Sequence, residues 1–242
     1  MNKSFVKSNF IAILEQVKPA LIMFNPQRVL VVVAHPDDEV LGCGGTIRKL
    51  VDLGADVHVV YMNNGCDLRE PFDASVIRKQ IEEAAAVLGA TISVNCYATA
   101  RFGEYDNLEF NSSIQSVVNE LCPDLVMTHD HNDLHQDHRK VHEAVMIACR
   151  FKPTSTVKAV WTFPVISSSD ISPRWAFEPE VFVSLTDKQL QSKINAMTHY
   201  KFELKQMAEL RGEVGIKSWA TFYGLQSGCK YAEPFRVLKM TL

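Results

Sequence analysis

The stretch RVLVVVAHPDDEVLGCGGT, residues 28–46, decides the fold. Its first part, Arg28–Ala34, is a nearly continuous β-branched run, which is typical of a strand buried on both faces of a parallel sheet. One imidazole and three carboxylates follow directly, in the segment His35–Glu39. Ligands of open α/β sheets bind beyond the carboxyl ends of the strands, so these side chains are candidates for a functional site.

Strand-like and helix-like segments alternate through the rest of the first two thirds of the chain. The expected strands are Asp56–Met62, Thr91–Tyr97, Asp124–Thr128 and Lys158–Phe163. The expected helices are Thr46–Leu53, Ser75–Leu88, Asn111–Leu121 and Arg139–Arg150, with Gly89 as a C-terminal cap. This alternation with short connections predicts an α/β fold, with an open, mostly parallel sheet covered by helices on both faces in a single domain.

The two ends of the chain are less regular. Beyond residue 164 we expect a strand at Phe182–Leu185, one long helix at Asp187–Arg211 with Thr186 as its N-cap, and a Gly-rich turn before a short final strand in 224–240. At the other end, residues 1–27 carry apolar side chains at roughly helical spacing. This segment is predicted to be a helix packed on the domain formed by residues 28–242.

Composition excludes several classes of protein. With 25 basic and 28 acidic residues the net charge is −3, which argues against binding to nucleic acid or to an anionic membrane surface. No stretch approaches the ~20 apolar residues of a membrane span, so no stable membrane insertion is predicted. The six cysteines include no C-x-x-C pair, which favours reduced thiols and a cytoplasmic protein.

A second polar cluster, THDHNDLHQDHRKVHEAV, begins at Thr128 as the fourth expected strand ends. Nitrogen and oxygen donors without cysteine suit Zn²⁺ or another divalent first-row metal. A catalytic zinc site needs three protein ligands and one open position. His35 and an aspartate from the first cluster, with a histidine from the second, would supply them. A spare aspartate could then accept a proton, and a spare histidine could stabilise an oxyanion.

Other roles stay open at this stage. The spacing of Gly42, Gly44 and Gly45 does not fit a dinucleotide-binding fingerprint, and carboxylates in that turn would repel phosphate. The remaining candidates either support the site or have an ordinary structural or solvated role. They are Glu39, expected to act through the backbone of the opening helix; Asp133 and Asp137, as partners of an imidazole; Arg78, as a sugar or phosphate contact; and His129, His131 and His142, near the pocket.

These motifs carry a resemblance to a known family. A-H-P-D-D-E at residues 34–39 resembles the signature of the PIG-L (LmbE-like) N-acetylglucosaminyl deacetylases. The segment D-L-H-Q-D-H-R at residues 133–139 is similar to the family's D-L-x-x-D-H-R motif, and A-E-P-F at residues 232–235 resembles its closing segment. The resemblance spans residues 28–238 and implies a Rossmann-like fold.

The resemblance also implies roles for individual residues. His35, Asp38 and His138 match metal ligands, with Zn²⁺ as the expected ion and Fe²⁺ as the alternative. Asp37 matches the general base that activates the water molecule at the metal. His135 matches a histidine proposed to act on the oxyanion or the leaving amine, although many relatives have asparagine there.

The implied activity is hydrolysis of an N-acetyl group on an amino sugar or small glycoconjugate, a small N-acetylated sugar being the expected substrate. Two alternatives stay open: a metal-dependent amidase or esterase for another small substrate, and a non-catalytic sugar- or nucleotide-binding module. The sequence does not determine the oligomeric state, and assembly into a homo-oligomer stays open.

Overall fold

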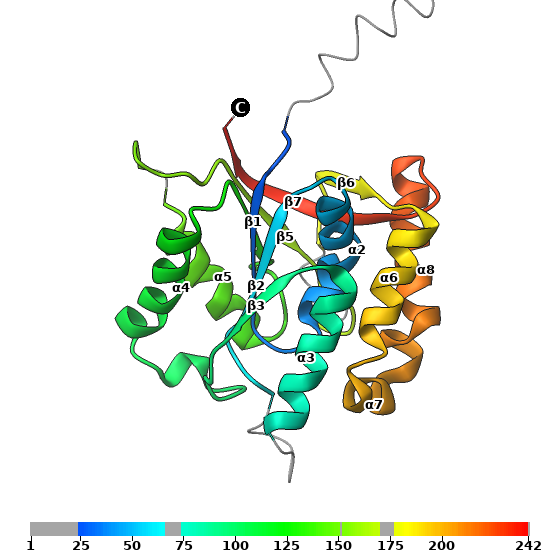
Figure 1. Cartoon of the computed structure of the whole chain (residues 1–242), viewed down its shortest axis with the longest axis horizontal. Helices are drawn as coiled ribbons and strands as arrows, with labels where there is room; N and C mark the ends of the chain where they lie inside the picture. The colour runs from blue at the N-terminus through cyan, green and yellow to red at the C-terminus, as the bar shows by residue number, and fades with distance from the viewer. Residues whose placement is uncertain (1–23, 66–73, 151, 170–176, 242) are drawn as a thin grey trace, which may run out of the picture.

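A single seven-stranded sheet organises the part of the chain that the computed structural model describes, residues 24–65, 74–150, 152–169 and 177–241 (Figure 1). The strands are β1 (Arg28–Val33), β2 (Asp56–Tyr61), β3 (Thr91–Val94), β4 (Leu125–His129), β5 (Ala159–Phe163), β6 (Val181–Ser184) and β7 (Ala232–Met240). Their order is β3-β2-β1-β4-β5-β7-β6. The first five run parallel, whereas β7 is antiparallel to both of its neighbours. The predicted open, mostly parallel sheet is confirmed.

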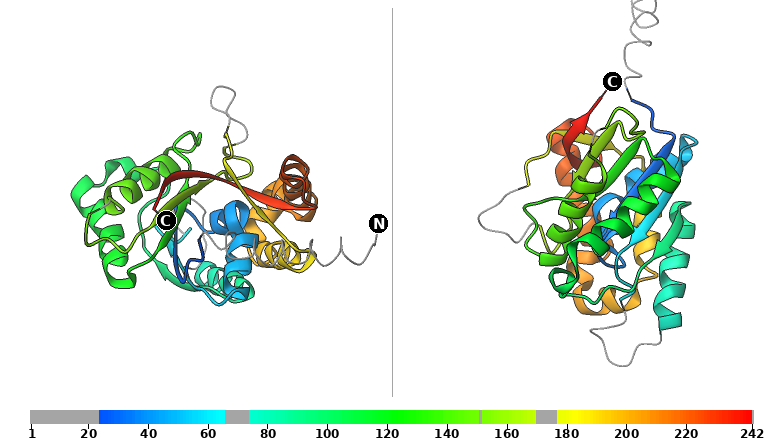
Figure 2. Two further views of the ribbon diagram at one scale, coloured as in Figure 1. Left: turned by 90° about the horizontal axis from the view of Figure 1, so that it is seen from above. Right: turned by 90° about the vertical axis from the view of Figure 1, so that its left-hand side faces the viewer.

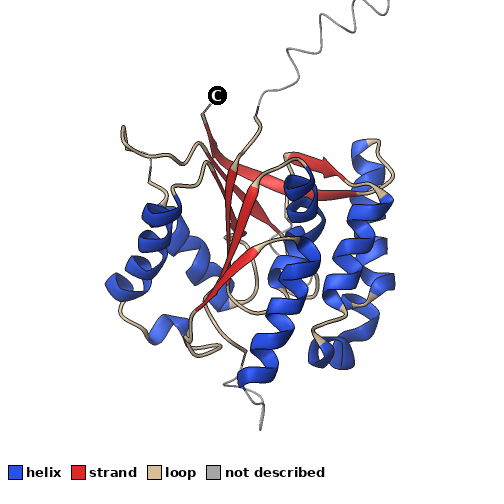
Figure 3. Ribbon diagram, in the orientation of Figure 1, coloured by secondary structure: helices blue, strands red, loops and turns tan. Residues whose placement is uncertain are grey.

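Helices cover both faces of this sheet (Figures 1 and 3). They are α2 (Asp38–Asp52), α3 (Ala74–Leu88), α4 (Asn107–Leu121), α5 (Gln136–Ala148), α6 (Asp187–Met197), α7 (Lys201–Arg211) and α8 (Glu213–Ser227), with a short 3₁₀ turn, η2, at Phe102–Glu104. Helices α4 and α5 lie on one face, and α2, α3, α6 and α8 on the other (Figure 2). Within the described ranges, no helix is both long and apolar enough to cross a membrane.

The central strands agree with the sequence prediction to within one residue at each end. The β1 segment from Val29 to Val33 is buried throughout, with apolar clusters on both sides of the sheet. A strand buried on both faces has to be apolar at every position, so its sequence signal is strong. The outer strand β3 ends at Val94, not at Tyr97 as predicted, and its side chains are half-buried or exposed.

Helix α2 begins earlier than predicted and contains a break. The expected start was Thr46, but helical structure begins at Asp38 and is interrupted at Cys43, whose φ of −142° is not helical. Beyond the break, the Glu233 carboxylate accepts hydrogen bonds from the backbone N–H groups of Gly45 (2.9 Å) and Thr46 (2.6 Å). The predicted start therefore matches only the second half of α2, which Glu233 caps from strand β7.

A buried lysine completes this connection between α2, α6 and β7. Lys193 is 1% exposed and donates to the Leu41 carbonyl (2.9 Å) and to Glu233 Oε1 (2.5 Å). Replacing one member of a buried pair leaves the other charge without its partner. We expect Lys193→Met to lower the free energy of unfolding by about 3–5 kcal/mol, measured by urea denaturation. Lys230→Met, which breaks the exposed pair with Asp187, is the control and should change stability little. Equal effects of the two substitutions would contradict this account.

The C-terminal third departs most from prediction. The single helix expected at 187–211 is two helices, α6 and α7, separated at Thr198–Tyr200. Helix α8 was not predicted, and Gly224, expected in a turn, lies inside it. A Cβ on Gly224 would lie 2.6 Å from the Lys230 carbonyl oxygen, so this glycine permits close packing of the helix against the segment entering β7. The turn itself occurs at Gly228, whose φ of 74° ends α8.

Local signals elsewhere are confirmed. Gly89 has a φ of 81° and ends α3, and Thr186 forms a capping box with Gln189 at the start of α6. The predicted N-terminal helix lies outside the described residues, apart from 24–27, where Phe24 packs against Trp161 (ring centroids 6.2 Å apart). The five cysteines that the structure describes are free thiols.

Candidate metal centre and active site

The two polar clusters meet at the switch point of the sheet. Strands β2 and β3 lie to one side of β1, and β4 and β5 to the other, so the connections leaving β1 and β4 diverge at their carboxyl ends. Ligands of open α/β sheets bind in such a crevice. The segment His35–Asp38 follows β1, and the segment His129–His138 runs from the last residue of β4 into the first turn of α5. The topology therefore brings both predicted clusters to one place.

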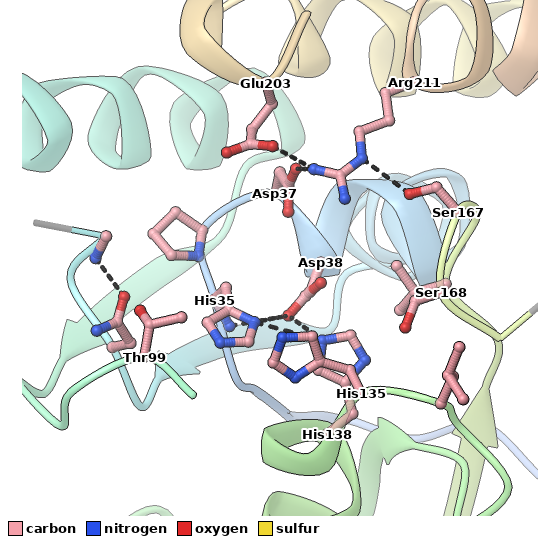
Figure 4. Close-up of a pocket in the computed structure, with 15 residues that line it drawn as sticks. His35, Asp37, Asp38, Thr99, His135, His138, Ser167, Ser168, Glu203 and Arg211 are labelled. Atoms are coloured by element: carbon pink, nitrogen blue, oxygen red, sulfur yellow. Dashed lines mark hydrogen bonds and ion pairs between the residues drawn. The ribbon is translucent and has the colours of Figure 1, made fainter. Parts of the chain in front are cut away.

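Three candidate ligand atoms form a nearly equilateral triangle (Figure 4). His35 Nδ1 lies 3.4 Å from Asp38 Oδ2 and 3.3 Å from His138 Nε2, and the last two atoms are 3.3 Å apart. Ligands at the ~2.0–2.1 Å typical of zinc, in tetrahedral geometry, are separated by about 3.3 Å. These three atoms thus have the spacing that a tetrahedral metal with one open position requires.

The turn after β1 explains how two adjacent aspartates face different ways. Asp37 adopts a left-handed conformation with a φ of 98°, which is uncommon for a residue with a side chain. Asp38 turns back and accepts a hydrogen bond from the backbone N–H of His35 (2.8 Å) through Oδ2. Asp38 therefore lies in the triangle, while Asp37 lies beside it and contacts Arg211 of α7 through Oδ2 (Figure 4).

Asp137 fixes the orientation of His35. Its Oδ2 lies 3.1 Å from His35 Nε2, and it also accepts hydrogen bonds from the backbone N–H groups of Ala100 (2.6 Å) and Phe102 (3.3 Å). With the proton of His35 on Nε2, its Nδ1 lone pair is directed to the triangle. A carboxylate behind a ligating imidazole selects the tautomer in this way.

Asp133 has the corresponding place behind His138. His138 Nδ1 lies 3.0 Å from Asp133 Oδ2. Asp133 is fully buried and accepts hydrogen bonds from the hydroxyls of Ser168 and Ser169 and from the backbone N–H of His135. Both flanking aspartates are therefore buried partners of imidazoles, and the alternative that they are solvated loop residues is wrong.

The electrostatics at the triangle favour a cation. Burial disfavours a charged His138, yet Asp38 and Asp133 outweigh burial and raise its pKa to about 10. Burial would raise the pKa of Asp38, but His138 and His129 hold it well below its usual range. Asp38 and Asp133 thus both stabilise positive charge at His138. A divalent cation bound in the triangle would supply that positive charge. The donor set and its charge fit such an ion.

His129 offers a second arrangement that the sequence left open. His129, Asp38 and His138 also have ligand atoms within 4.8 Å of one another. However, His129 Nε2 accepts a hydrogen bond from the backbone N–H of Ala34 (2.9 Å), so its lone pair is already used. The His129 ring stacks on His138 with centroids 3.9 Å apart. The geometry thus makes His129 a packing partner of His138 rather than a donor to the triangle.

His135 lies beside the triangle and presents an N–H group. Its Nδ1 accepts a hydrogen bond from the backbone N–H of Asp137 (3.2 Å), which caps the start of α5. Burial lowers the pKa of His135 to about 4, and the neighbouring His138 and His35 add to that shift. A neutral imidazole whose Nδ1 accepts this bond carries its proton on Nε2 and can donate it. His135 also offers a ring nitrogen within 4.8 Å of those of His35 and His138, but its Nδ1 already accepts the bond from Asp137 N–H.

Asp37 is held by an arginine that sequence reasoning missed. Arg211, the last residue of α7, donates to Asp37 Oδ2 (2.8 Å), to Glu203 and to the Ser167 hydroxyl (3.0 Å). Burial raises the pKa of Asp37 well above its usual range, and Arg211 opposes that rise. A lone arginine 174 residues from Asp37 carries no motif, so no sequence signal could have revealed the pair.

The remaining candidates separate into two groups. Glu39 is fully buried and accepts hydrogen bonds from the Asp37 backbone N–H (3.2 Å) and the Tyr200 hydroxyl (2.7 Å), which agrees with support through the backbone. Arg78 pairs with Glu82 on the exposed side of α3 and does not line the pocket. The interpretation of Arg78 as a substrate contact therefore has no support in the geometry.

A pocket of about 360 Å³ opens directly above the triangle. Besides the site residues it is lined by polar side chains, including Asn63, Thr99 and Ser168, and by the apolar Leu134 and Val165. Ligand pockets range from ~300 to 1,000 Å³, so this one suits a small molecule. It contains Asp37, the triangle and His135 within one cavity.

Comparison with known proteins identifies the family of this chain. Residues 30–149 match the family model PIG-L, described as GlcNAc-PI de-N-acetylase. An uncharacterised deacetylase of Escherichia coli K12, YaiS, is 30% identical over 185 residues, which cover 72% of this chain and 90% of that protein. The chain belongs to the PIG-L family.

Other PIG-L relatives have named activities. The diacetylchitobiose deacetylase of Thermococcus kodakarensis is 26% identical over 228 residues, which cover 87% of this chain and 82% of that protein. The solved structure of the N,N'-diacetylchitobiose deacetylase of Pyrococcus horikoshii covers 94% of this chain and 92% of its own, with a TM-score of 0.73 and 23% identity. At that identity the structural match shows the shared fold.

Proposed function

We propose that this PIG-L protein is a metal-dependent hydrolase that removes the N-acetyl group from an N-acetylated amino sugar or a small glycoconjugate. The observation that carries the proposal is the triangle of His35 Nδ1, Asp38 Oδ2 and His138 Nε2, with Asp37 beside it in one pocket. Relatives named as deacetylases of N-acetylated sugars support the choice of substrate.

The proposed cofactor is one divalent ion, with Zn²⁺ as the first choice and Fe²⁺ as the alternative. Two imidazole nitrogens and one carboxylate oxygen suit either ion. When bound, the ion would polarise the amide carbonyl and lower the pKa of a water molecule. Asp137 and Asp133 would hold the two imidazoles in the required tautomers.

Asp37 acts as the proton acceptor in this proposal. The water oxygen attacks the amide carbon while its proton passes to the Asp37 carboxylate. Its Oδ2 accepts from Arg211, and among the described residues none donates to its Oδ1, which is available for the proton. The C–N bond then breaks, the proton moves to the departing nitrogen, and the products are acetate and the free amino sugar.

His135 stabilises the charge that develops on the carbonyl oxygen. Its neutral ring donates through Nε2–H, and it lines the same pocket as Asp37. A donor fixed in place before the reaction costs no reorganisation when the oxyanion forms. The N-cap bond to Asp137 N–H provides this fixed orientation.

A panel of substrates tests this function. Purified protein loaded with Zn²⁺, or with Fe²⁺ without oxygen, is incubated with N-acetylglucosamine, diacetylchitobiose and an N-acetylglucosaminyl glycoside, and acetate and amine are measured together. Equal release of both supports deacetylation. Turnover of an ester or a non-sugar amide alone would favour the broader hydrolase. Binding of sugar with neither metal nor turnover would favour a non-catalytic module.

Asp137 provides a prediction about metal affinity. Asp137→Asn keeps the shape of the side chain but weakens its hold on the Nε2 proton of His35. Loss of such a partner typically weakens metal binding by about 10–100-fold, and we expect this effect in a competition titration with a chromogenic chelator. Asp52→Asn, on the exposed end of α2, is the control. Unchanged affinity in Asp137→Asn would contradict the proposed role.

A cytoplasmic location is part of the proposal. It is supported by the free thiols, since cysteines stay reduced in that compartment.

A further inference from the structure

The Arg211 side chain joins three segments that are distant in the sequence. Its guanidinium contacts Asp37 after β1, Ser167 in the connection after β5, and Glu203 on its own helix α7 (Figure 4). Arg211 ends α7, and the next residue, Gly212, is the N-cap of α8. The arginine backbone is therefore fixed between two helices, and 18% of its side chain is exposed, toward the pocket.

Two of these contacts are to residues with unusual backbone conformations. Asp37 has a φ of 98° and Ser167 a φ of 73°, both in the left-handed region that residues with side chains rarely adopt. Such conformations persist where surrounding contacts hold them, and they concentrate at functional sites. One planar guanidinium with donors in fixed directions contacts both residues. Arg211 thus holds the two sides of the pocket opposite the triangle.

The hydrogen bond from Arg211 also gives the two carboxylate oxygens of Asp37 different roles. Arg211 occupies Oδ2 at 2.8 Å, and the Asp37 backbone N–H is bound by Glu39. Rotation of the carboxylate would break the contact with Arg211. The other oxygen therefore keeps one position relative to the triangle.

We propose that Arg211 is a positioning residue that holds the Asp37 carboxylate in the orientation from which it accepts the proton. This inference rests on the proposed function, and it assigns Arg211 a role in kcat rather than in substrate binding. The reasoning is geometric: a displacement of about 1 Å in a reacting group can cost about 10²-fold in rate. A role in substrate binding alone would instead raise KM with kcat unchanged.

Chemical rescue tests the inference. In Arg211→Ala we expect kcat to fall about 10²-fold with little change in KM, and added guanidinium or methylguanidinium at tens of millimolar to restore at least about tenfold of that loss. Arg211→Lys should be intermediate, because an ammonium group supplies the charge without the planar fork. The control is Arg48→Ala, which removes a similar arginine–carboxylate pair with Asp52 away from the pocket. Its kcat should stay unchanged and unaffected by guanidinium.

Several results would overturn the assignment of Arg211 as a positioning residue. A kcat for Arg211→Ala within a few-fold of wild type would do so, as would a loss that guanidinium does not restore while the melting temperature falls. If neither substitution yields folded protein, the role of Arg211 is structural and the inference is wrong. The proposed function fails separately, because wild-type protein would then release no acetate in the same assay.

Discussion

His138→Ala should bind no stoichiometric divalent metal and should lose at least about 10³-fold in kcat/KM, since the ion supplies several kcal/mol of transition-state stabilisation and each 1.4 kcal/mol is a factor of ten. His138 Nε2 is one corner of the triangle, 3.3 Å from both other donor atoms. Its removal leaves two ligands, which cannot hold the ion in tetrahedral geometry. Metal content by elemental analysis and acetate release measure the two effects on one preparation.

His142→Ala is the matched control for this substitution. His142 lies one helical turn further along α5, and its Nδ1 bonds to the His129 carbonyl at 2.9 Å rather than facing the pocket. This variant should keep its metal and most of its activity. A His138→Ala protein with wild-type metal content and turnover would show that the triangle is not the metal site.

Asp37→Asn should reduce kcat by about 10²–10⁴-fold while the protein keeps its metal, because general-base catalysis contributes that range. The amide preserves the shape of the side chain but cannot accept the proton from water. Asp37 takes no part in the triangle, since its Oδ2 contacts Arg211 at 2.8 Å. The two predictions thus separate the roles of adjacent aspartates: Asp38→Asn should weaken metal binding, and Asp37→Asn should not.

The measurement for Asp37 is a comparison of kcat and bound metal in the two asparagine variants. An Asp37→Asn protein that lost its metal along with activity would place Asp37 among the ligands instead. One that retained full kcat with bound metal would rule out Asp37 as the base.

The central fold was predictable because burial constrains it. Strand β1 is apolar at every position from Val29 because both of its faces are covered, and this pattern can be recognised in the sequence alone. The start of α2 could not be predicted, because its first turn carries two buried carboxylates, Asp38 and Glu39. Its break at Cys43 is stabilised by Lys193 and Glu233, which come from distant elements. Helix α8 was missed because its glycines serve close packing, which only the tertiary structure reveals.

The candidate site divides in the same way. Residues His35–Asp38 and Asp133–His138 lie in continuous motifs, so they could be predicted from the sequence as candidate site residues. The residues alone did not determine which histidine of the second cluster donates; the bond from Ala34 N–H to His129 Nε2 disfavours His129, and only the three-dimensional structure shows that bond. Arg211 depends on the meeting of α7 with the loop after β1, and a single arginine outside any motif gives no sign of that contact.

The central claim is that one ion held by His35, Asp38 and His138 is required for hydrolysis of an N-acetylated sugar. The most direct measurement is a titration of chelator-treated protein with Zn²⁺, or with Fe²⁺ under anaerobic conditions, while acetate release is followed. We predict no turnover in the stripped protein, a linear rise that ends at one equivalent of metal per chain, and no such rise in His138→Ala. Full turnover in stripped protein that contains no measurable metal would contradict the claim.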